Sequence, residues 1–136
     1  MRLIPDHILG IVTVFQEAEG EPYEGKVAVA EVILRRTKRK YFSDGTVAGT
    51  VLRRLQFSGM NEDSANRIRS FKIDNTDNPI VQDCIRAWTE ALAPSNRVPD
   101  CMHYFNPSLC DPAWARGATV VAEIGNHRFV IPKEGK

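Results

Sequence analysis

The sequence lacks the apolar runs of about 20 residues that cross a bilayer, so it predicts a chain with no membrane insertion. An excess of charge of either sign is also absent. The formal net charge is +1 at pH 7, so no overall field favours nucleic acid or a membrane surface as a partner. The first apolar stretch has no small-residue cleavage site after it, and we expect synthesis in the cytoplasm without a signal peptide.

Cysteine is scarce, and an odd count of three does not complete a disulfide framework. Cys84 lies in an apolar pattern and is expected in the core, whereas a pairing of Cys101 with Cys110 stays open. The chain has no C-x-x-C pair and no H-E-x-x-H helix. A zinc site made of Cys101, His103, Cys110 and His127 would have unusual spacing, so we predict no metal and no organic cofactor. No cysteine stands at a helix start that would activate it for a Cys–His pair.

The length of 136 residues is sufficient for one domain with a proper core. No repeat, low-complexity tract or linker divides the chain, so we expect a single domain over residues 1–136. Two β-prone runs, residues 118–123 and 127–131, flank a short turn and predict a small hairpin. Helices are predicted at residues 6–19, 22–40, 46–55, 62–70 and 79–93. The fold class is therefore α+β, mainly α, with one β element at the C-terminal end.

The first two helices differ in how their apolar residues are distributed. The first is expected to bury a stripe made of Ile8, Ile11, Val12 and Phe15. Its opposite side carries Gly10, Thr13 and Glu17, and small residues beside a carboxylate either border a groove or face bulk water. Residues 27–34 of the second helix are apolar on nearly every side, which is typical of a helix in the centre of a domain.

Glu17 is the principal candidate for chemistry, in a stretch with four glutamates within eight residues. It lies near the C-terminal end of its helix, where exposed carbonyls disfavour a charged carboxylate. Desolvation in a cleft acts in the same direction, and an acid still protonated near neutral pH is a proton donor. The alternative is a solvated side chain. The dipole of the next helix accounts for Glu24 and partly for Glu21.

Other segments carry groups that suit a polar ligand such as a sugar. Gln56 and Ser58 are hydrogen-bonding groups, with a turn around a core Phe57 as the alternative. Residues 103–107 interleave aromatic faces with polar tips, which also fits a packed loop. The basic run at residues 35–40 is either a solvated helix end or a phosphate-binding patch.

Taken together, four blocks resemble the cell wall hydrolases of the SleB/CwlJ type, a spore-cortex lytic enzyme group with relatives in phages and bacteria. Residues 17–30 resemble the family's E-A-x-G-E-x-x-x-G-x-x-A-V-A block, and residues 56–58 are its Gln-Phe-Ser. Residues 103–107, His-Tyr-Phe-Asn-Pro, are followed by Trp114. Residues 124–129 are similar to the closing G-x-H-x-F. Each block alone is weak, but the ordered set spans most of the chain.

What the resemblance implies is a lysozyme-like, lytic-transglycosylase-like fold with a cleft, in which Glu17 is the catalytic acid. Members of the family cleave the peptidoglycan glycan strand between N-acetylmuramic acid and N-acetylglucosamine, some of them as lytic transglycosylases. Glu31, Arg35 and Gly59 depart from the family pattern and leave substrate details open. The predicted substrate-binding residues are Glu21, Gln56, Phe57, Ser58, His103, Tyr104, Asn106 and His127.

A hydrolase would need a second carboxylate beside Glu17. The candidates Glu21, Glu31 and Asp111 are not compelling, and a structural ion pair is favoured for Glu31, so the pattern favours a transglycosylase. His127 either hydrogen-bonds within the site or holds the hairpin in place.

We expect a monomer whose partner is the peptidoglycan glycan strand and which acts on the cell wall. A phage endolysin released by a holin, or a virion-associated lysin, fits the missing leader. The first alternative is a catalytically inactive peptidoglycan-binding or structural phage protein with the same fold. The second is a nucleic-acid-binding protein that uses residues 35–40.

Overall fold

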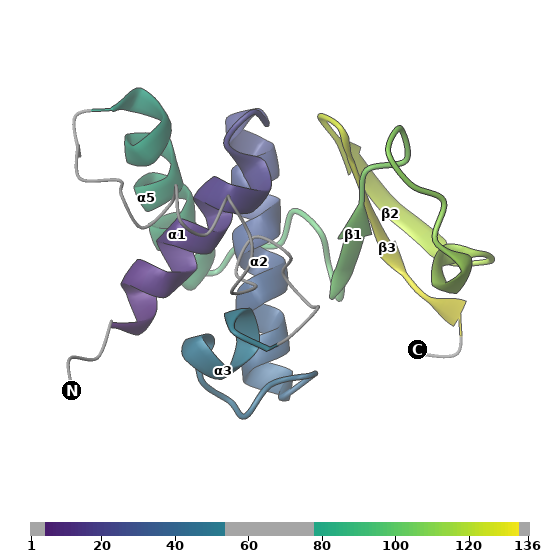
Figure 1. The fold of residues 1–136 in the computed structure, drawn as a ribbon, viewed down its shortest axis with the longest axis horizontal. Coiled ribbons are helices and arrows are strands. Elements are labelled where there is room, and N and C mark those ends of the chain that lie inside the picture. Colours follow the sequence, from purple (N-terminus) through teal and green to yellow (C-terminus); the bar gives the residue numbers. More distant parts are fainter. Residues whose placement is uncertain (1–4, 54–77, 134–136) are drawn as a thin grey trace.

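The structure, a computed structural model, describes residues 5–53 and 78–133. Within these ranges the chain forms helices α1 (Asp6–Ala18), α2 (Tyr23–Arg39), α3 (Val47–Val51) and α5 (Pro79–Leu92), and then strands β1 (His103–Phe105), β2 (Thr119–Ile124) and β3 (His127–Ile131). A single 3-10 turn, η2 (Ala113–Ala115), lies between β1 and β2. The helices gather on one side and the sheet on the other (Figure 1), which confirms the α+β, mainly α prediction. None of the described helices is both long and apolar enough to cross a membrane.

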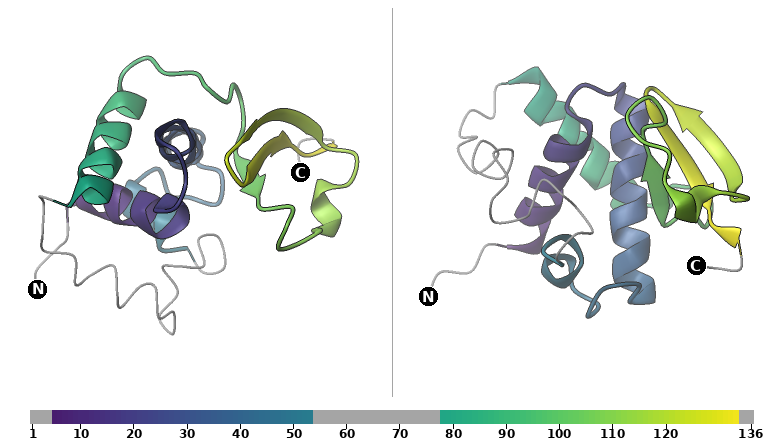
Figure 2. Two further views of the ribbon diagram at one scale, coloured as in Figure 1. Left: turned by 90° about the horizontal axis from the view of Figure 1, so that it is seen from above. Right: turned by 45° about the vertical axis from the view of Figure 1, so that its right-hand side comes forward.

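Helix α2 is the central element. It lies between α1 and the sheet in each view (Figures 1 and 2), and α1, α3 and α5 all contact it. Phe129 of β3 belongs to the same hydrophobic core. The predicted apolar run is confirmed as buried up to its last residue, Leu34, which is partly buried. Six of its residues are 0% exposed: Val27, Ala28, Val29, Ala30, Val32 and Ile33. The helix ends where Lys40 takes a left-handed conformation with a φ of 53°.

Helix α1 buries most of the predicted stripe, with Ile11 and Val12 partly buried against the core, but it also buries residues predicted for the opposite face. Ile8 is 41% exposed, although Phe15 is buried as expected. Gly10 and Thr13, predicted for the opposite face, are both buried. The physical reason is Trp88 of α5, whose ring occupies the space beside Gly10. A Cβ at Gly10 would come within 2.3 Å of that ring, so the missing side chain is what lets the two helices approach.

The starts of the shorter helices follow from capping side chains. Thr46 caps α3 by accepting a hydrogen bond from a backbone N–H of the first turn at 2.9 Å. Asn78 caps α5 in the same way at 2.8 Å, and Pro79 takes the first helical position. The predicted helix at residues 46–55 ends earlier, at Val51. The helix predicted at residues 62–70 lies outside the described residues.

The predicted hairpin is present as β2 and β3, and β1 adds a strand that the sequence did not indicate. The sheet order is β1-β3-β2, with both pairs antiparallel. Tyr104 lies opposite Phe129, and His103 lies opposite Val130. Because successive side chains point to opposite faces, Tyr104 and Phe129 share one face of the sheet and His103 and Val130 the other. At three residues, β1 is too short to show an alternating pattern.

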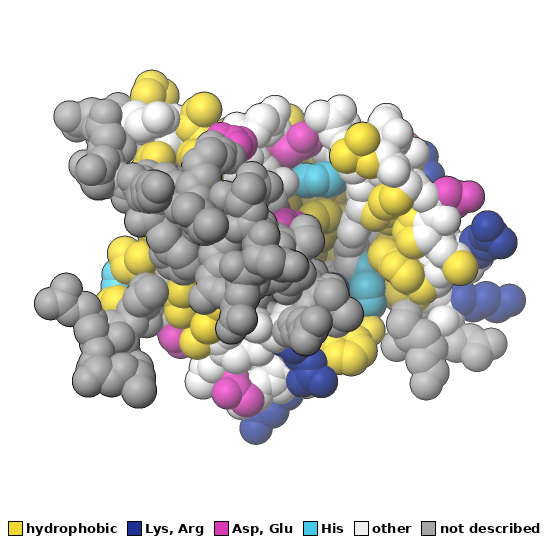
Figure 3. Space-filling model, in the orientation of Figure 1, with side chains coloured by type: hydrophobic (Ala, Val, Ile, Leu, Met, Phe, Trp, Pro, Cys, Tyr) yellow, Lys and Arg dark blue, Asp and Glu magenta, His cyan; other side chains and the backbone are white. Residues whose placement is uncertain are grey.

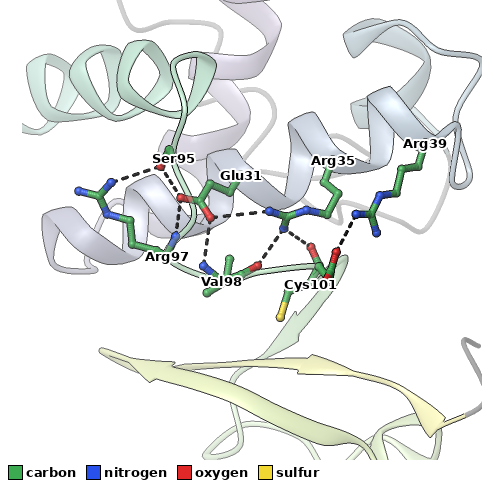
Figure 4. Close-up of polar contacts among 8 residues, drawn as sticks. Glu31, Arg35, Arg39, Ser95, Arg97, Val98 and Cys101 are labelled. Carbon is green, nitrogen blue, oxygen red and sulfur yellow. Dashed lines mark hydrogen bonds and ion pairs between the residues drawn. The ribbon is translucent and has the colours of Figure 1, made fainter.

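The carboxylate of Glu31 holds the segment between α5 and β1 against α2 (Figure 4). Glu31 is 3% exposed and accepts hydrogen bonds from the backbone N–H groups of Arg97 at 2.9 Å and Val98 at 3.1 Å. The hydroxyl of Ser95 also donates to it, and Arg35 lies 4.0 Å away. The structural ion pair predicted for Glu31 is therefore confirmed.

Three arginines of the basic run at residues 35–40 bind the same segment, and Figure 4 shows two of them, Arg35 and Arg39. Their acceptors are the carbonyls of Val98 and Cys101 for Arg35, the carbonyl of Met102 for Arg36 and the carboxylate of Asp100 for Arg39, at 2.7–2.9 Å. The guanidinium groups that a phosphate-binding patch would require are thus engaged within the fold.

The cysteines play no part in cross-linking. Cys84 and Cys101 are buried and Cys110 is exposed, and all three are free. The core position predicted for Cys84 is confirmed, and Cys101 and Cys110 do not form a disulfide.

Candidate active site

Glu17 lies in the last turn of α1, where the helical part meets the sheet. Its Oε1 accepts a hydrogen bond from the hydroxyl of Tyr104 in β1 at 2.5 Å. A recess runs along this junction, with histidine and acidic side chains on its walls (Figure 3). Glu17 is part-buried, so it reaches solvent from within the protein surface rather than projecting into bulk water.

Burial raises the pKa of Glu17 above that of a free glutamate, and it is the largest influence on this group. The Tyr104 hydroxyl and the charge of Arg36 lower the pKa without cancelling the effect of burial. Tyr104 itself stays protonated, because burial and the nearby Glu17 raise its pKa well above the usual value. The site therefore pairs a carboxyl group that retains its proton to higher pH with a phenol that does not titrate.

Arg36 is a cation of this site that was not predicted from the sequence. It is buried on α2, and its Nε donates to the carbonyl of Met102 at 2.7 Å. Its guanidinium also lies 5.6 Å from the centre of the Tyr41 ring. The sequence contained a signal, since Arg36 follows the first family block, but a basic helix end offered a simpler explanation.

His127 lies beside Tyr104 on the face of the sheet that carries Phe129. The ring centres of His127 and Tyr104 are 5.0 Å apart, and those of Tyr104 and Phe129 are 5.4 Å apart. Burial lowers the pKa of His127 more than the charge of Glu21 raises it, so the imidazole is neutral near pH 7. Its Nδ1 is buried and has no hydrogen-bond partner within the described part of the chain. An unpaired buried nitrogen at this place is available to a ligand.

Glu21 closes the hairpin turn that precedes His127. Its two carboxylate oxygens accept hydrogen bonds from the backbone N–H of Asn126 at 2.8 Å and from the side-chain amide of Asn126 at 3.0 Å. Gly125 has a φ of 59°, and a Cβ there would lie 2.3 Å from a Glu21 oxygen. Glu21 thus has a structural role, and its contact with substrate stays a prediction.

His103 lies on the sheet face opposite to Tyr104. Its Nε2 is 3.1 Å from the hydroxyl of Tyr41. Burial, helped by the charge of Arg36, lowers the pKa of His103 to about 4, so this imidazole is also neutral near pH 7. Its predicted contact with substrate stays a prediction.

The remaining predicted binding residues are Asn106, Gln56, Phe57 and Ser58. The side-chain oxygen of Asn106 accepts a hydrogen bond from the N–H of Ser108 at 2.9 Å and so shapes the turn after β1. Gln56, Phe57 and Ser58 lie outside the described residues. The substrate-binding roles of all four remain predictions.

The candidates for a second carboxylate are held elsewhere. Glu31 binds the segment before β1, and Glu21 binds the hairpin turn. Asp111 is exposed and lies 3.8 Å from Arg116 at the surface. In the described ranges, the hydrogen-bond and ion-pair partners of these three carboxylates do not include Glu17. Residues 5–53 and 78–133 likewise contain no group of three His, Cys, Asp or Glu residues placed to hold a metal ion.

Comparison with known proteins identifies the family. A family model described as Cell Wall Hydrolase matches residues 20–130, a range that begins just after Glu17. The spore cortex-lytic enzyme of Bacillus subtilis is 34% identical over 116 residues, which cover 85% of this chain and 34% of that protein. The enzyme of the same name from Oceanobacillus iheyensis is 33% identical, with coverages of 85% and 38%. The chain therefore spans little more than a third of the length of these relatives.

Solved structures agree with these matches. The catalytic domain of the germination-specific lytic transglycosylase SleB from Bacillus anthracis has a TM-score of 0.74 and 26% identity, covering 92% of this chain and 93% of that domain. The catalytic domain of the Bacillus cereus SleB protein has a TM-score of 0.73 and 28% identity, covering 92% and 88%. The lysozyme-like fold implied by the resemblance is thus confirmed. With its fold and most of its length matched, the chain belongs to the cell wall hydrolase family of the SleB/CwlJ type.

Proposed function

We propose that this protein cleaves the glycan strand of peptidoglycan between N-acetylmuramic acid and N-acetylglucosamine, with Glu17 as general acid and base. The observation that carries the proposal is the Glu17 carboxyl group, held by Tyr104 at a recessed helix–sheet junction, with a pKa that burial raises. Family membership supports peptidoglycan as the substrate. A lytic transglycosylase among the structural relatives supports the reaction type.

The first step uses the proton that burial keeps on Glu17. Glu17 donates it to the glycosidic oxygen, the bond from that oxygen to C1 of the muramic residue breaks, and positive charge develops on the ring. The 6-hydroxyl of the same sugar then attacks C1, and the Glu17 carboxylate removes the proton of that hydroxyl. The products are a free N-acetylglucosamine end and an anhydro-muramic end, with no water consumed and Glu17 reprotonated.

Within the described residues, the positions of the candidate second carboxylates support this reaction over hydrolysis. A hydrolase of the common type places a second carboxylate across the scissile bond to activate water or to attack. The three candidates identified from the sequence, Glu21, Glu31 and Asp111, have other partners in the fold. An internal nucleophile removes the requirement for such a group.

Tyr104 and Arg36 act as positioning residues in this proposal. The Tyr104 hydroxyl fixes the direction of one Glu17 oxygen. The positive charge of Arg36 stabilises the carboxylate that forms after proton donation, because it lowers the pKa of Glu17. The pair thereby limits how far burial raises that pKa, so that Glu17 can both release and recover the proton.

The test is digestion of purified peptidoglycan by the wild type and by Glu17→Gln, with mass spectrometry of the fragments. A transglycosylase yields muropeptides that lack one water at the muramic residue, and Glu17→Gln yields none. Reducing sugar ends would replace the internal attack with hydrolysis. Free amines without new sugar ends would mean an amidase or peptidase and would overturn the proposal.

The phage delivery expected from the sequence stays a prediction, as does the monomeric state. The relatives described above are spore cortex-lytic enzymes of bacteria. Parallel digestion of spore cortex and of vegetative cell walls separates the two settings, because a spore enzyme acts preferentially on cortex and an endolysin on the vegetative wall. Absence of lysis in both, with retained wall binding, would instead support the inactive binding protein.

A further inference from the structure

An unbroken chain of ring contacts runs from the end of α2 to the segment after β1. The ring centres are 4.7 Å apart for Phe42 and Tyr41, 5.3 Å for Tyr41 and His103, 5.2 Å for His103 and Trp114, and 5.8 Å for Trp114 and Phe105. We call these five residues the aromatic row. Hydrophobic side chains gather around a histidine below the recess in the space-filling view (Figure 3).

Two members of the aromatic row present large apolar surface to solvent. Phe42 is 44% exposed and Trp114 is 46% exposed. The rings between them are part-buried, and the hydroxyl of Tyr41 lies 3.1 Å from a ring nitrogen of His103. The exposed rings are therefore supported by fixed neighbours.

The backbone conformation of Phe42 indicates that its ring has a role outside the hydrophobic core. Its φ of 48° lies in the left-handed region, which is unfavourable for a bulky side chain and favours Asn or Gly. A buried ring would offset this strain by hydrophobic contact, but Phe42 leaves much of its surface in water. Such strain at an exposed aromatic residue is a feature of ligand-binding positions.

The aromatic row is continuous with the Glu17 site. His103 directly precedes Tyr104 in β1, and Arg36 links the two regions. The Arg36 guanidinium lies 5.6 Å from the Tyr41 ring, and its charge acts on both Glu17 and His103. His103 and Tyr104 point to opposite faces of β1, so Arg36 is the group that joins the Glu17 site to the aromatic row.

We propose that the aromatic row is a subsite for sugar rings of the glycan strand beyond the cleaved bond. This inference rests on the function proposed for Glu17. The apolar faces of pyranose rings pack on aromatic surface such as that of Trp114 and Phe42. The His103 Nδ1, buried and without a partner in the described ranges, offers a polar contact to hydroxyl or acetamido groups. The Arg53 guanidinium, 5.3 Å from the centre of the Phe42 ring, attracts the carboxylates of the peptide stems.

The test measures retention on insoluble peptidoglycan in a Glu17→Gln background, so that cleavage does not remove the ligand. Trp114→Ala is expected to weaken binding about tenfold, as for the loss of one aromatic anchor. Trp114→Tyr should retain most of the binding, because it keeps an aromatic face. Leu109→Ala is the matched control, since Leu109 is an 82% exposed apolar residue in the same segment but outside the aromatic row.

A second variant separates binding from folding. Phe42→Asn suits the left-handed backbone, so thermal unfolding should be unchanged or shifted upward while retention falls. Unchanged retention in both Trp114→Ala and Phe42→Asn would overturn the subsite. A rival occupant, a second copy of this chain, predicts instead that Trp114→Ala changes the mass measured by light scattering and leaves retention unchanged.

The outcome is independent of the catalytic proposal. If the wild type releases anhydro-muropeptides but the two variants bind like the background protein, the subsite is wrong and the function of Glu17 stands. If no product forms but Trp114→Ala still loses retention, the aromatic row binds glycan and the catalytic proposal is wrong.

Discussion

Glu17 and Glu31 lie on adjacent helices, and both are carboxylates withdrawn from bulk water, but their surroundings differ. Glu31 accepts hydrogen bonds from two backbone N–H groups and from Ser95, and it has a cation nearby in Arg35. Glu17 accepts from Tyr104, and the positive charge of Arg36 acts on it.

This difference distinguishes Glu31, a structural carboxylate, from Glu17, a carboxyl group suited to acid–base catalysis. The groups around Glu31 are hydrogen-bond donors and a cation from the fold itself, so this side chain serves to hold the chain segment before β1. Around Glu17 the dominant influence is burial, which favours the protonated form. Around Glu17, the hydrogen bond and the nearby charge do not fully offset the effect of burial on the pKa. A general acid requires a carboxyl group with a raised pKa of this kind.

Glu17→Gln gives the largest expected effect. Glycan cleavage should fall by about 1,000-fold, the scale of a lost acid–base group. The same substitution should raise stability relative to the wild type at high pH. Because the pKa of Glu17 is raised in the folded state, ionisation at high pH opposes folding, and wild-type stability relative to Glu17→Gln declines as pH rises through the raised pKa. Fragment analysis and urea unfolding between pH 4 and pH 9 measure the two effects. Cleavage at wild-type rate would remove Glu17 from the mechanism.

Glu31→Ala is expected to lower stability, whereas the main effect of Glu17→Gln is on activity. Removing this buried acceptor leaves two backbone N–H groups without their partner and takes away the carboxylate beside Arg35, which should cost about 3 kcal/mol of unfolding free energy. Asp111→Ala is the control, because this exposed carboxylate has only a 3.8 Å surface pair and should change stability by less than about 0.5 kcal/mol. Equal stability of the two variants in urea would contradict the structural role of Glu31.

Gly10→Ala tests the packing that positions the helix bearing Glu17. A Cβ at Gly10 would lie 2.3 Å from the Trp88 ring, so overpacking should lower the unfolding free energy by about 2 kcal/mol. Gly20→Ala is the matched control, since nothing lies within 4 Å of a Cβ there. Thermal unfolding of the pair provides the measurement. A Gly10→Ala protein as stable as Gly20→Ala would mean that α1 and α5 can separate without loss.

Tyr104→Phe gives the smallest effect but the sharpest test of the Glu17 environment. It removes the hydrogen bond that lowers the pKa of Glu17, so that pKa should rise and the alkaline limb of the pH–rate profile should move to higher pH. The rate at the optimum should fall about tenfold through lost positioning. Tyr23→Phe is the control, because the Tyr23 hydroxyl donates a hydrogen bond to Glu90, at 2.7 Å, rather than to Glu17. A profile unmoved by Tyr104→Phe would show that this hydroxyl does not set the acidity of Glu17.

Local signals predicted most of the helices and the hairpin. Thr46, Asn78 and Pro79 act through groups within one helical turn, so their effects are readable from adjacent residues. The apolar run of α2 was equally direct, because a helix that is apolar on all sides is buried whatever its neighbours are. The burial of Gly10 on α1 was not predictable in this way, since the ring that covers it comes from Trp88 on another helix.

Residue types at short, fixed spacing were sufficient to predict the family, the central buried helix and Glu17 as the candidate catalytic residue. Tertiary structure alone decided that Tyr104 and Arg36 surround Glu17, that Glu21 and Glu31 are engaged elsewhere and that five rings form one row. These contacts join residues separated by many positions along the chain. Their energies depend on burial and distance, and both quantities exist only once the helices and the sheet have packed together.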